Sequence, residues 1–86
     1  MGKAFEHMAV LDLVDRELYR AELKFPKFNS AHEGFAIIQE EFVELWEEIT
    51  PQHEKRSLEK MRTEAIQLAA MATRFIIDIC PPERGE

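Results

Sequence analysis

Apolar side chains recur along this chain at spacings of three and four residues, which is the period of an amphipathic helix. No stretch alternates apolar and polar residues as a half-buried strand does. Prolines and the Asn29-Ser30 pair separate three long periodic segments. The pattern predicts an all-α chain with helices over about residues 4–24, 30–49 and 57–79.

The residues that bound these segments are typical of helix ends. Pro26 disfavours a helical Phe25, so the first helix should end before this connector. Ser30 and Glu33 form a capping-box pattern at the start of the second helix. Prolines also close the second and third segments, at Pro51 and Pro81.

The third segment is apolar on two sides. Its main stripe holds Leu58, Met61, Ala65, Leu68, Ala72, Phe75, Ile76 and Ile79, and an opposite stripe holds Ile66, Ala70, Thr73 and Ile77. Two other helices of the same chain cover two such stripes poorly. We therefore expect a homodimer or homotetramer, assembled as a four-helix-bundle-type homo-oligomer.

Length and composition narrow the class of protein. With 86 residues, the chain is expected to form a single helical domain over residues 1–86. Its one cysteine, Cys80, cannot form an intramolecular disulfide, which favours a cytoplasmic location. The longest apolar stretch, residues 66–79, is interrupted by polar and charged side chains and is too short to cross a membrane.

The net charge of −6 comes from one segment. Residues 29–53 hold no Lys or Arg, whereas the rest of the chain holds 11 acidic and 11 basic residues. The acidic residues of this segment are Glu33, Glu40, Glu41, Glu44, Glu47 and Glu48. A chain that neutralises phosphates by itself would show the reverse balance, so we expect no direct nucleic-acid binding. Cation binding is compatible with this balance.

Two of these acids are neighbours at the edge of an apolar stripe. With Glu41 set at zero on a helical wheel, Glu44 lies at about 300° and Glu48 at about 340°. Like charges three residues apart repel each other and destabilise a helix. Water, salt, a basic neighbour or a divalent cation must offset that repulsion.

The third helix has a similar polar edge, formed by Glu64 and Gln67. If the two helices pack by their apolar stripes, this edge can face Glu41 and Glu44 and gather oxygen ligands of the kind Mg²⁺ prefers. The alternative is a solvated acidic face, because glutamate is common on protein surfaces.

The sequence resembles a known family at these positions. Glu40, Glu41 and Glu44 match the E-E-x-x-E motif of the MazG-like, all-α nucleoside triphosphate pyrophosphohydrolases. The second motif of that family, E-x-x-D, falls on Glu64 and Gln67, so an amide stands in place of the aspartate. The resemblance covers about residues 24–79 and is nearest to a small MazG-like group of phages and prokaryotes.

The resemblance implies an activity and a set of ligands. It implies a homodimer or homotetramer that uses Mg²⁺, or Mn²⁺, to hydrolyse a nucleoside triphosphate to the monophosphate and pyrophosphate. Glu41, Glu44 and Glu64 would be the catalytic metal ligands. Gln67 can ligate a cation but brings no charge, and Glu48 could supply the missing carboxylate.

Four other residues are candidates for substrate binding, each with a structural alternative. Lys60 and Arg74 could meet a triphosphate, or could form ion pairs with Glu64 and Asp78 four residues away. Trp46 could stack on a nucleobase, or could lie in the core or at a dimer interface. His32 could contact a ligand, or could be a surface residue near the helix cap.

The sequence thus predicts a Mg²⁺-dependent nucleoside triphosphate pyrophosphohydrolase that clears unwanted nucleotides. Two alternatives stay open. One is an interaction module that keeps the helical bundle but has lost activity. The other is a sensor that binds a nucleotide or a cation without turnover.

Overall fold

The computed structural model describes residues 2–83 and contains three α-helices over that range. These are α1 (Lys3–Lys24), α2 (Ala31–Ile49) and α3 (Leu58–Ile79), with a short 3₁₀-helix, η1 (His53–Lys55), before α3. Within these residues there is no strand, so the predicted all-α class is confirmed. Each helix begins within one residue of its predicted start and ends where the sequence indicates.

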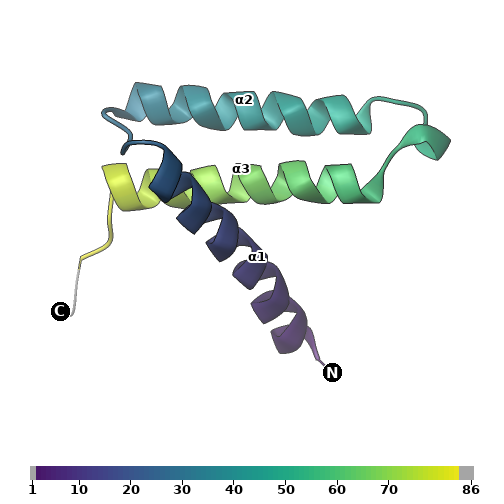
Figure 1. Cartoon of the computed structure of the whole chain (residues 1–86), viewed down its shortest axis with the longest axis horizontal. Coiled ribbons are helices and arrows are strands. Elements are labelled where there is room, and N and C mark those ends of the chain that lie inside the picture. Colours follow the sequence, from purple (N-terminus) through teal and green to yellow (C-terminus); the bar gives the residue numbers. More distant parts are fainter. Residues whose placement is uncertain (1, 84–86) are drawn as a thin grey trace.

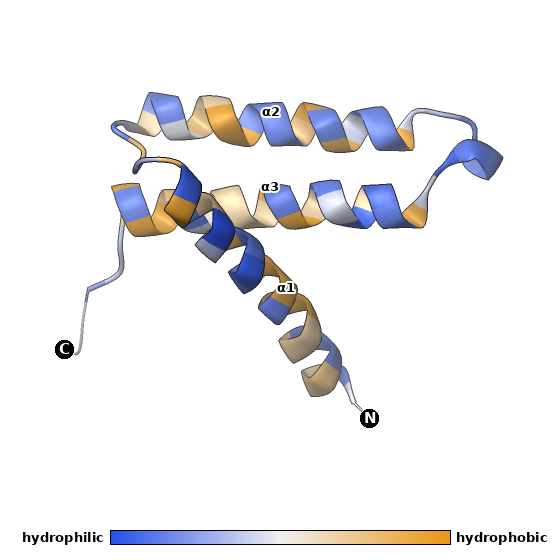
Figure 2. Ribbon diagram, viewed as in Figure 1, coloured by the Kyte–Doolittle hydropathy of each residue, from blue (hydrophilic) through white to orange (hydrophobic). Residues whose placement is uncertain are grey.

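The helices α2 and α3 form an antiparallel hairpin, with η1 in the connection between them (Figure 1). The helix α1 crosses α3 at a steep angle, and its N-terminal half projects away from the hairpin (Figure 1). Hydrophobic and hydrophilic residues alternate along both α2 and α3 (Figure 2).

Local hydrogen bonds explain where α2 begins. The Ser30 hydroxyl accepts a bond of 3.1 Å from the Glu33 amide, as the capping-box pattern predicts. The Glu33 carboxylate returns to the Asn29 amide at 2.8 Å, one residue before the cap. These bonds satisfy amide groups that a helix start leaves free and hold the connector from α1 against α2.

The buried core is small and sits where α1 meets the hairpin. It contains Leu18, Ala21, Phe28, Ala70 and Met71. Gly34 allows α2 to approach closely here, because an added methyl group would lie 2.7 Å from the Phe75 ring and 2.9 Å from the Phe28 ring. Without a side chain at Gly34, both rings can pack directly against the α2 backbone.

A buried arginine ties α3 to the chain that leaves α1. The Arg74 side chain is 3% exposed. One guanidinium nitrogen donates to two carbonyl oxygens of the connector, at 2.7 Å to Phe25 and 2.9 Å to Pro26. The other terminal nitrogen donates to the Ala21 carbonyl at 3.4 Å. Arg74 therefore supplies donors to the two connector carbonyl groups just after α1, and it shares the Ala21 carbonyl with the Phe25 amide.

The charge of Arg74 is balanced by Asp78, one turn later on α3. The two side chains form an ion pair at 3.3 Å, and Asp78 is 4% exposed. The same Asp78 oxygen accepts a bond of 3.0 Å from the Phe28 amide. The predicted ion pair between Arg74 and Asp78 is thus confirmed, and it is buried at the junction of all three segments.

Much apolar surface remains uncovered in the single chain. On α2, Phe35, Phe42 and Trp46 are 60%, 61% and 58% exposed. On the projecting half of α1, Phe5 and Met8 are also exposed. Trp46 is therefore no part of the core of this chain, so that alternative is wrong, whereas a place at a dimer interface and stacking on a nucleobase stay predictions.

In the described part of the chain, no helix is both long enough and apolar enough to cross a membrane.

We expect Arg74→Met to destabilise the fold by about 3 kcal/mol, because it leaves Asp78 as an unpaired buried charge and strands the connector carbonyls. Equilibrium unfolding in urea measures this loss. Arg16→Met is the matched control: Arg16 forms an exposed pair with Asp12 at 2.9 Å, so its removal should change stability by no more than about 0.5 kcal/mol. Equal losses in the two variants would contradict the anchoring role.

Candidate functional site

Three carboxylates meet on one face of the hairpin. One oxygen from each of Glu41 and Glu44 on α2 and Glu64 on α3 lies within 4.8 Å of the other two. The predicted meeting of the two helix edges is therefore confirmed. Glu44 is exposed, whereas Glu41 and Glu64 are partly buried between the helices.

Two oxygen atoms of this cluster lack any protein partner. Glu41 Oε2 and Glu64 Oε2 are buried, and neither accepts a hydrogen bond from the residues that the structure describes. A buried carboxylate oxygen without a donor or a counter-charge is costly, because it has lost its water without replacement. A proton or a cation bound at these oxygens would therefore lower the free energy of the cluster.

The pKa values of two carboxyl groups in the cluster are raised, which also indicates that their charged forms are disfavoured. Burial, followed by the neighbouring Glu44 carboxyl and then the charges of Glu64 and Glu40, raises the pKa of Glu41 to about 7. Burial and the charge of Glu44, then that of Glu48, raise the pKa of Glu64. A proton therefore binds Glu41 near neutral pH, mainly because its carboxyl is partly buried, and a divalent cation would compete for the same oxygens.

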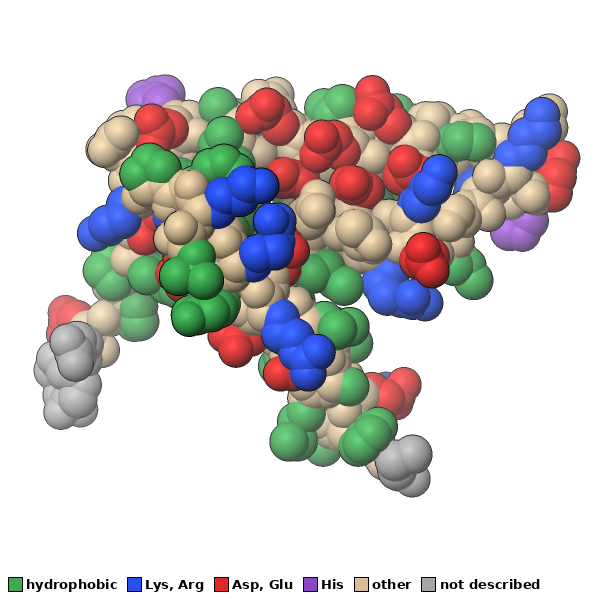
Figure 3. Space-filling model, in the orientation of Figure 1, with side chains coloured by type: hydrophobic (Ala, Val, Ile, Leu, Met, Phe, Trp, Pro, Cys, Tyr) green, Lys and Arg blue, Asp and Glu red, His purple; other side chains and the backbone are tan. Residues whose placement is uncertain are grey.

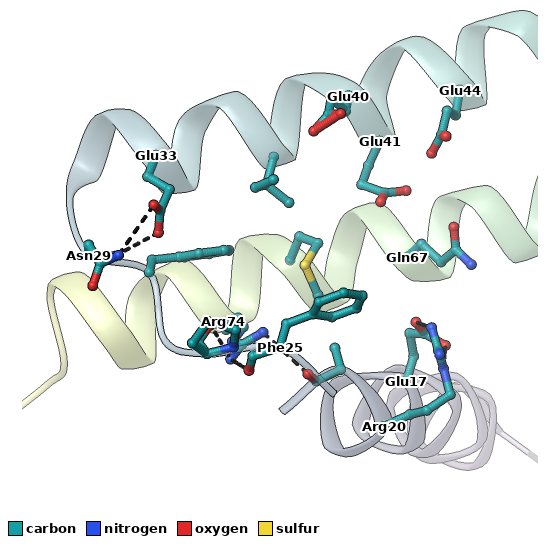
Figure 4. A pocket seen from close by; sticks show the side chains of 15 residues that line it. Glu17, Arg20, Phe25, Asn29, Glu33, Glu40, Glu41, Glu44, Gln67 and Arg74 are labelled. Carbon is teal, nitrogen blue, oxygen red and sulfur yellow. Dashed lines mark hydrogen bonds and ion pairs between the residues drawn. The ribbon is translucent and has the colours of Figure 1, made fainter. Parts of the chain in front are cut away.

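A cavity of about 550 Å³ adjoins the cluster. All three helices contribute to its walls: Glu17 and Arg20 from α1, Glu40, Glu41 and Glu44 from α2, and Gln67 from α3. The carboxylates of α2 face the α1 side chains across this space, with Gln67 between them (Figure 4). The connector adds Phe25 and Asn29.

The charged side chains that line the cavity are mostly acidic. Five glutamates line it, against two arginines. Acidic side chains gather along α2 and α3 on this face, and basic side chains of α1 lie beside them (Figure 3). A free anion would be repelled here, whereas a cation, or an anion that carries cations with it, is compatible with this charge.

The remaining predicted metal ligands lie near the cluster. Gln67 lines the cavity, and its amide is close to the acidic side chains (Figure 4). Glu48 lies outside the trio of closest oxygens, but its charge helps to raise the pKa of Glu64.

The predicted substrate-binding residues are more scattered. Among the described residues, the lining of this cavity does not include His32, Trp46 or Lys60. Arg74 does line it, but its guanidinium is bound to connector carbonyls and to Asp78. Within residues 2–83, Lys60 forms no ion pair with Glu64, although the spacing of the two residues favours one.

The cavity also has walls from α1 and the connector that no sequence motif indicates, and these include Glu17, Arg20, Phe25 and Asn29. Glu17 and Arg20 are three residues apart, a spacing that occurs on many solvated helices. Their proximity to Glu41 depends on the angle at which α1 crosses α3. No local pattern in the sequence encodes that angle.

Comparisons of this chain with protein families, with curated proteins and with solved structures found no match in any of the three. The case for function therefore rests on the geometry and chemistry of the cluster and its cavity.

We expect Glu41→Gln to stabilise the metal-free protein at pH 8, because it removes a carboxylate whose ionisation opposes folding. The pKa of Glu41 rises on folding from about 4.5 to about 7, so wild-type stability should fall as pH rises between these values and stay flat above. After allowance for solvent screening, the gain is on the order of 1 kcal/mol.

Thermal melting at pH 5 and pH 8 without divalent ions measures this effect. Glu47→Gln removes the same charge from an exposed position of α2 and serves as the control. If the stability of Glu41→Gln depended on pH as strongly as that of the wild type, Glu41 would not be the group that titrates.

Proposed function

We propose that this protein is a Mg²⁺-dependent nucleoside triphosphate pyrophosphohydrolase in which Glu41, Glu44 and Glu64 hold the cation. One observation carries the proposal: two buried oxygens, on Glu41 and Glu64, lack partners within a cluster of three carboxylates. The donor set is all oxygen, which matches the preference of Mg²⁺ and Mn²⁺. The resemblance of the two glutamate motifs to the MazG-like family supports the same reaction.

The residues of the cluster suit different parts of this reaction. Bound Mg²⁺ would neutralise phosphate charge and make water a better nucleophile. Glu41 and Glu64 lie between the helices, where partial burial limits their movement. Glu44 is exposed at the cavity and can accept a hydrogen bond from an attacking water. Gln67 offers an amide oxygen from α3.

The cavity has the size and position that the substrate needs. Its volume of about 550 Å³ is within the usual range for small-molecule sites. Apolar side chains such as Ile37 and Met71 line it together with the glutamates of α2. A triphosphate bound through its metal ion would therefore place its phosphates near Glu41 and Glu44, with the nucleoside toward the connector.

We further propose that the protein works as a homodimer or homotetramer in the cytoplasm, without nucleic-acid or membrane partners. Phe35 and Phe42 lie about 180° and 160° around α2 from the cavity residue Glu44. On α3, exposed Ala72 lies about 160° from Ala70, which packs against α1. The face of the hairpin away from α1 is thus apolar and is flanked by small residues, which suits a second hairpin.

A sensor that binds a metal–nucleotide complex without turnover is the second candidate function. The specific observation behind it is Gln67, which lies at the cavity wall where the resembling family carries an aspartate. An amide weakens the hold on a cation, and it removes a charge that would help position a second one.

The decisive assay is pyrophosphate release from a panel of NTPs and dNTPs with Mg²⁺ or Mn²⁺. We expect release by the wild type and a loss of about a hundredfold or more in Glu44→Gln, because this glutamate is placed at both metal and water. Glu47→Gln is the control and should keep wild-type activity. Metal-induced thermal stabilisation without pyrophosphate release would favour the sensor, and the absence of both would remove the enzyme and the sensor together.

We expect Gln67→Asp to raise the affinity for Mn²⁺ by about tenfold, because a carboxylate adds charge beside the cluster. Titration calorimetry with Mn²⁺ measures the change. Gln39→Asp adds the same charge on α2 outside this cavity and should have little effect. An equal response of the two variants would show that Gln67 does not occupy a ligand position.

A further inference from the structure

We propose that Arg20 binds the phosphate chain of the ligand, on the wall of the cavity opposite the metal-holding glutamates. The ligand class this implies is a metal-bound polyphosphate, not a free anion. The inference rests on the proposed function, since it assigns the second half of the same site.

Arg20 is in place to do this without a large movement. It lies on α1 and faces the cavity across from Glu41 and Glu44 (Figure 4). Glu17 holds its guanidinium at two points, at 3.1 Å from Nε and 2.5 Å from a terminal nitrogen. Such two-point pairing fixes the plane of the guanidinium. Only part of its set of N–H donors is used, and the rest are free for phosphate oxygens.

No other cation of the cavity wall is free for this role. Among the described residues that line it, the positive side chains are Arg20 and Arg74, and no lysine is present. Arg74 is 3% exposed and donates to the carbonyl groups of Phe25 and Pro26. An anionic ligand in this space therefore meets Arg20 as its one accessible positive partner on the described walls.

The charge balance selects what kind of anion can enter. Five glutamates surround the space, so a free triphosphate would meet strong repulsion. Cations carried by the phosphate chain remove that repulsion on the α2 side, where Glu41 and Glu44 lie. On the α1 side, Arg20 meets the part of the chain that the metal does not cover. One ligand would thus be bound on the α2 side through its metal cation and on the α1 side by the guanidinium of Arg20.

Glu17 lowers the affinity of Arg20 for phosphate. It is 18% exposed, less than the 54% of Arg20, so it is the more fixed partner of the pair. Its carboxylate competes with phosphate for the guanidinium and adds repulsion. Removal of the Glu17 charge should therefore strengthen phosphate binding, whereas removal of Arg20 should weaken it.

The test measures binding of a non-hydrolysable α,β-imido nucleoside triphosphate in the presence of Mn²⁺, together with binding of Mn²⁺ alone. We expect Arg20→Gln to weaken binding of the analogue about tenfold, because a charge-assisted hydrogen bond is lost. Its affinity for Mn²⁺ alone and its melting temperature should stay near those of the wild type. Glu17→Gln should bind the analogue about threefold more tightly.

Arg16→Gln is the matched control, since it removes the same charge from α1 at a position outside this cavity. Equal effects of Arg16→Gln and Arg20→Gln on analogue binding would overturn the role of Arg20. If the wild type binds Mn²⁺ in that case, the proposed metal site survives. A wild-type protein that binds neither Mn²⁺ nor the analogue would overturn both proposals.

Discussion

The geometry of this small protein depends on the buried guanidinium of Arg74. It gathers the carbonyl groups at the end of α1, and through Asp78 it also holds the Phe28 amide that leads into α2. With a core of so few buried side chains, apolar packing alone leaves the angle between α1 and the hairpin weakly determined. Because a buried charge without its partners is strongly destabilising, few other arrangements of α1 against the hairpin are compatible with this network. The position of the cavity walls follows from it.

The hairpin has two chemically different faces: an acidic face on the side of α1, and an apolar face on the other side. On the α1 side, burial and then the neighbouring carboxyl groups raise the pKa of Glu41 to about 7, and two oxygens of the cluster have no donor among the described residues. Such an arrangement opposes folding unless a proton or a cation relieves it. Stability is thus lower at the place where a ligand could supply the missing charge. This relation between stability and function is the one that the proposed metal site would show.

On the other side, the hairpin exposes large apolar side chains such as Phe42 and Trp46. A chain of 86 residues buries a modest fraction of its surface, and association is a common way to bury the rest. Placing the apolar face away from α1 leaves the cavity open while the other face is available for a second copy. In the proposed assembly, the two faces would bind a second copy and a ligand without competing for the same side chains.

The sequence by itself determined the local structure and the acidic half of the site. The periodicity, the capping residues and the prolines predicted three helices, and a helical wheel placed Glu41, Glu44 and Glu64 at edges that meet once α2 packs on α3. It did not determine the basic half of the cavity, the burial of Arg74, or the exposure of Trp46. Helix formation and side-chain facing depend on neighbours within a turn or two, which the sequence displays directly. The crossing of α1 over α3 is set by contacts between residues about fifty positions apart, such as Arg74 with Phe25, and only the tertiary structure brings these together.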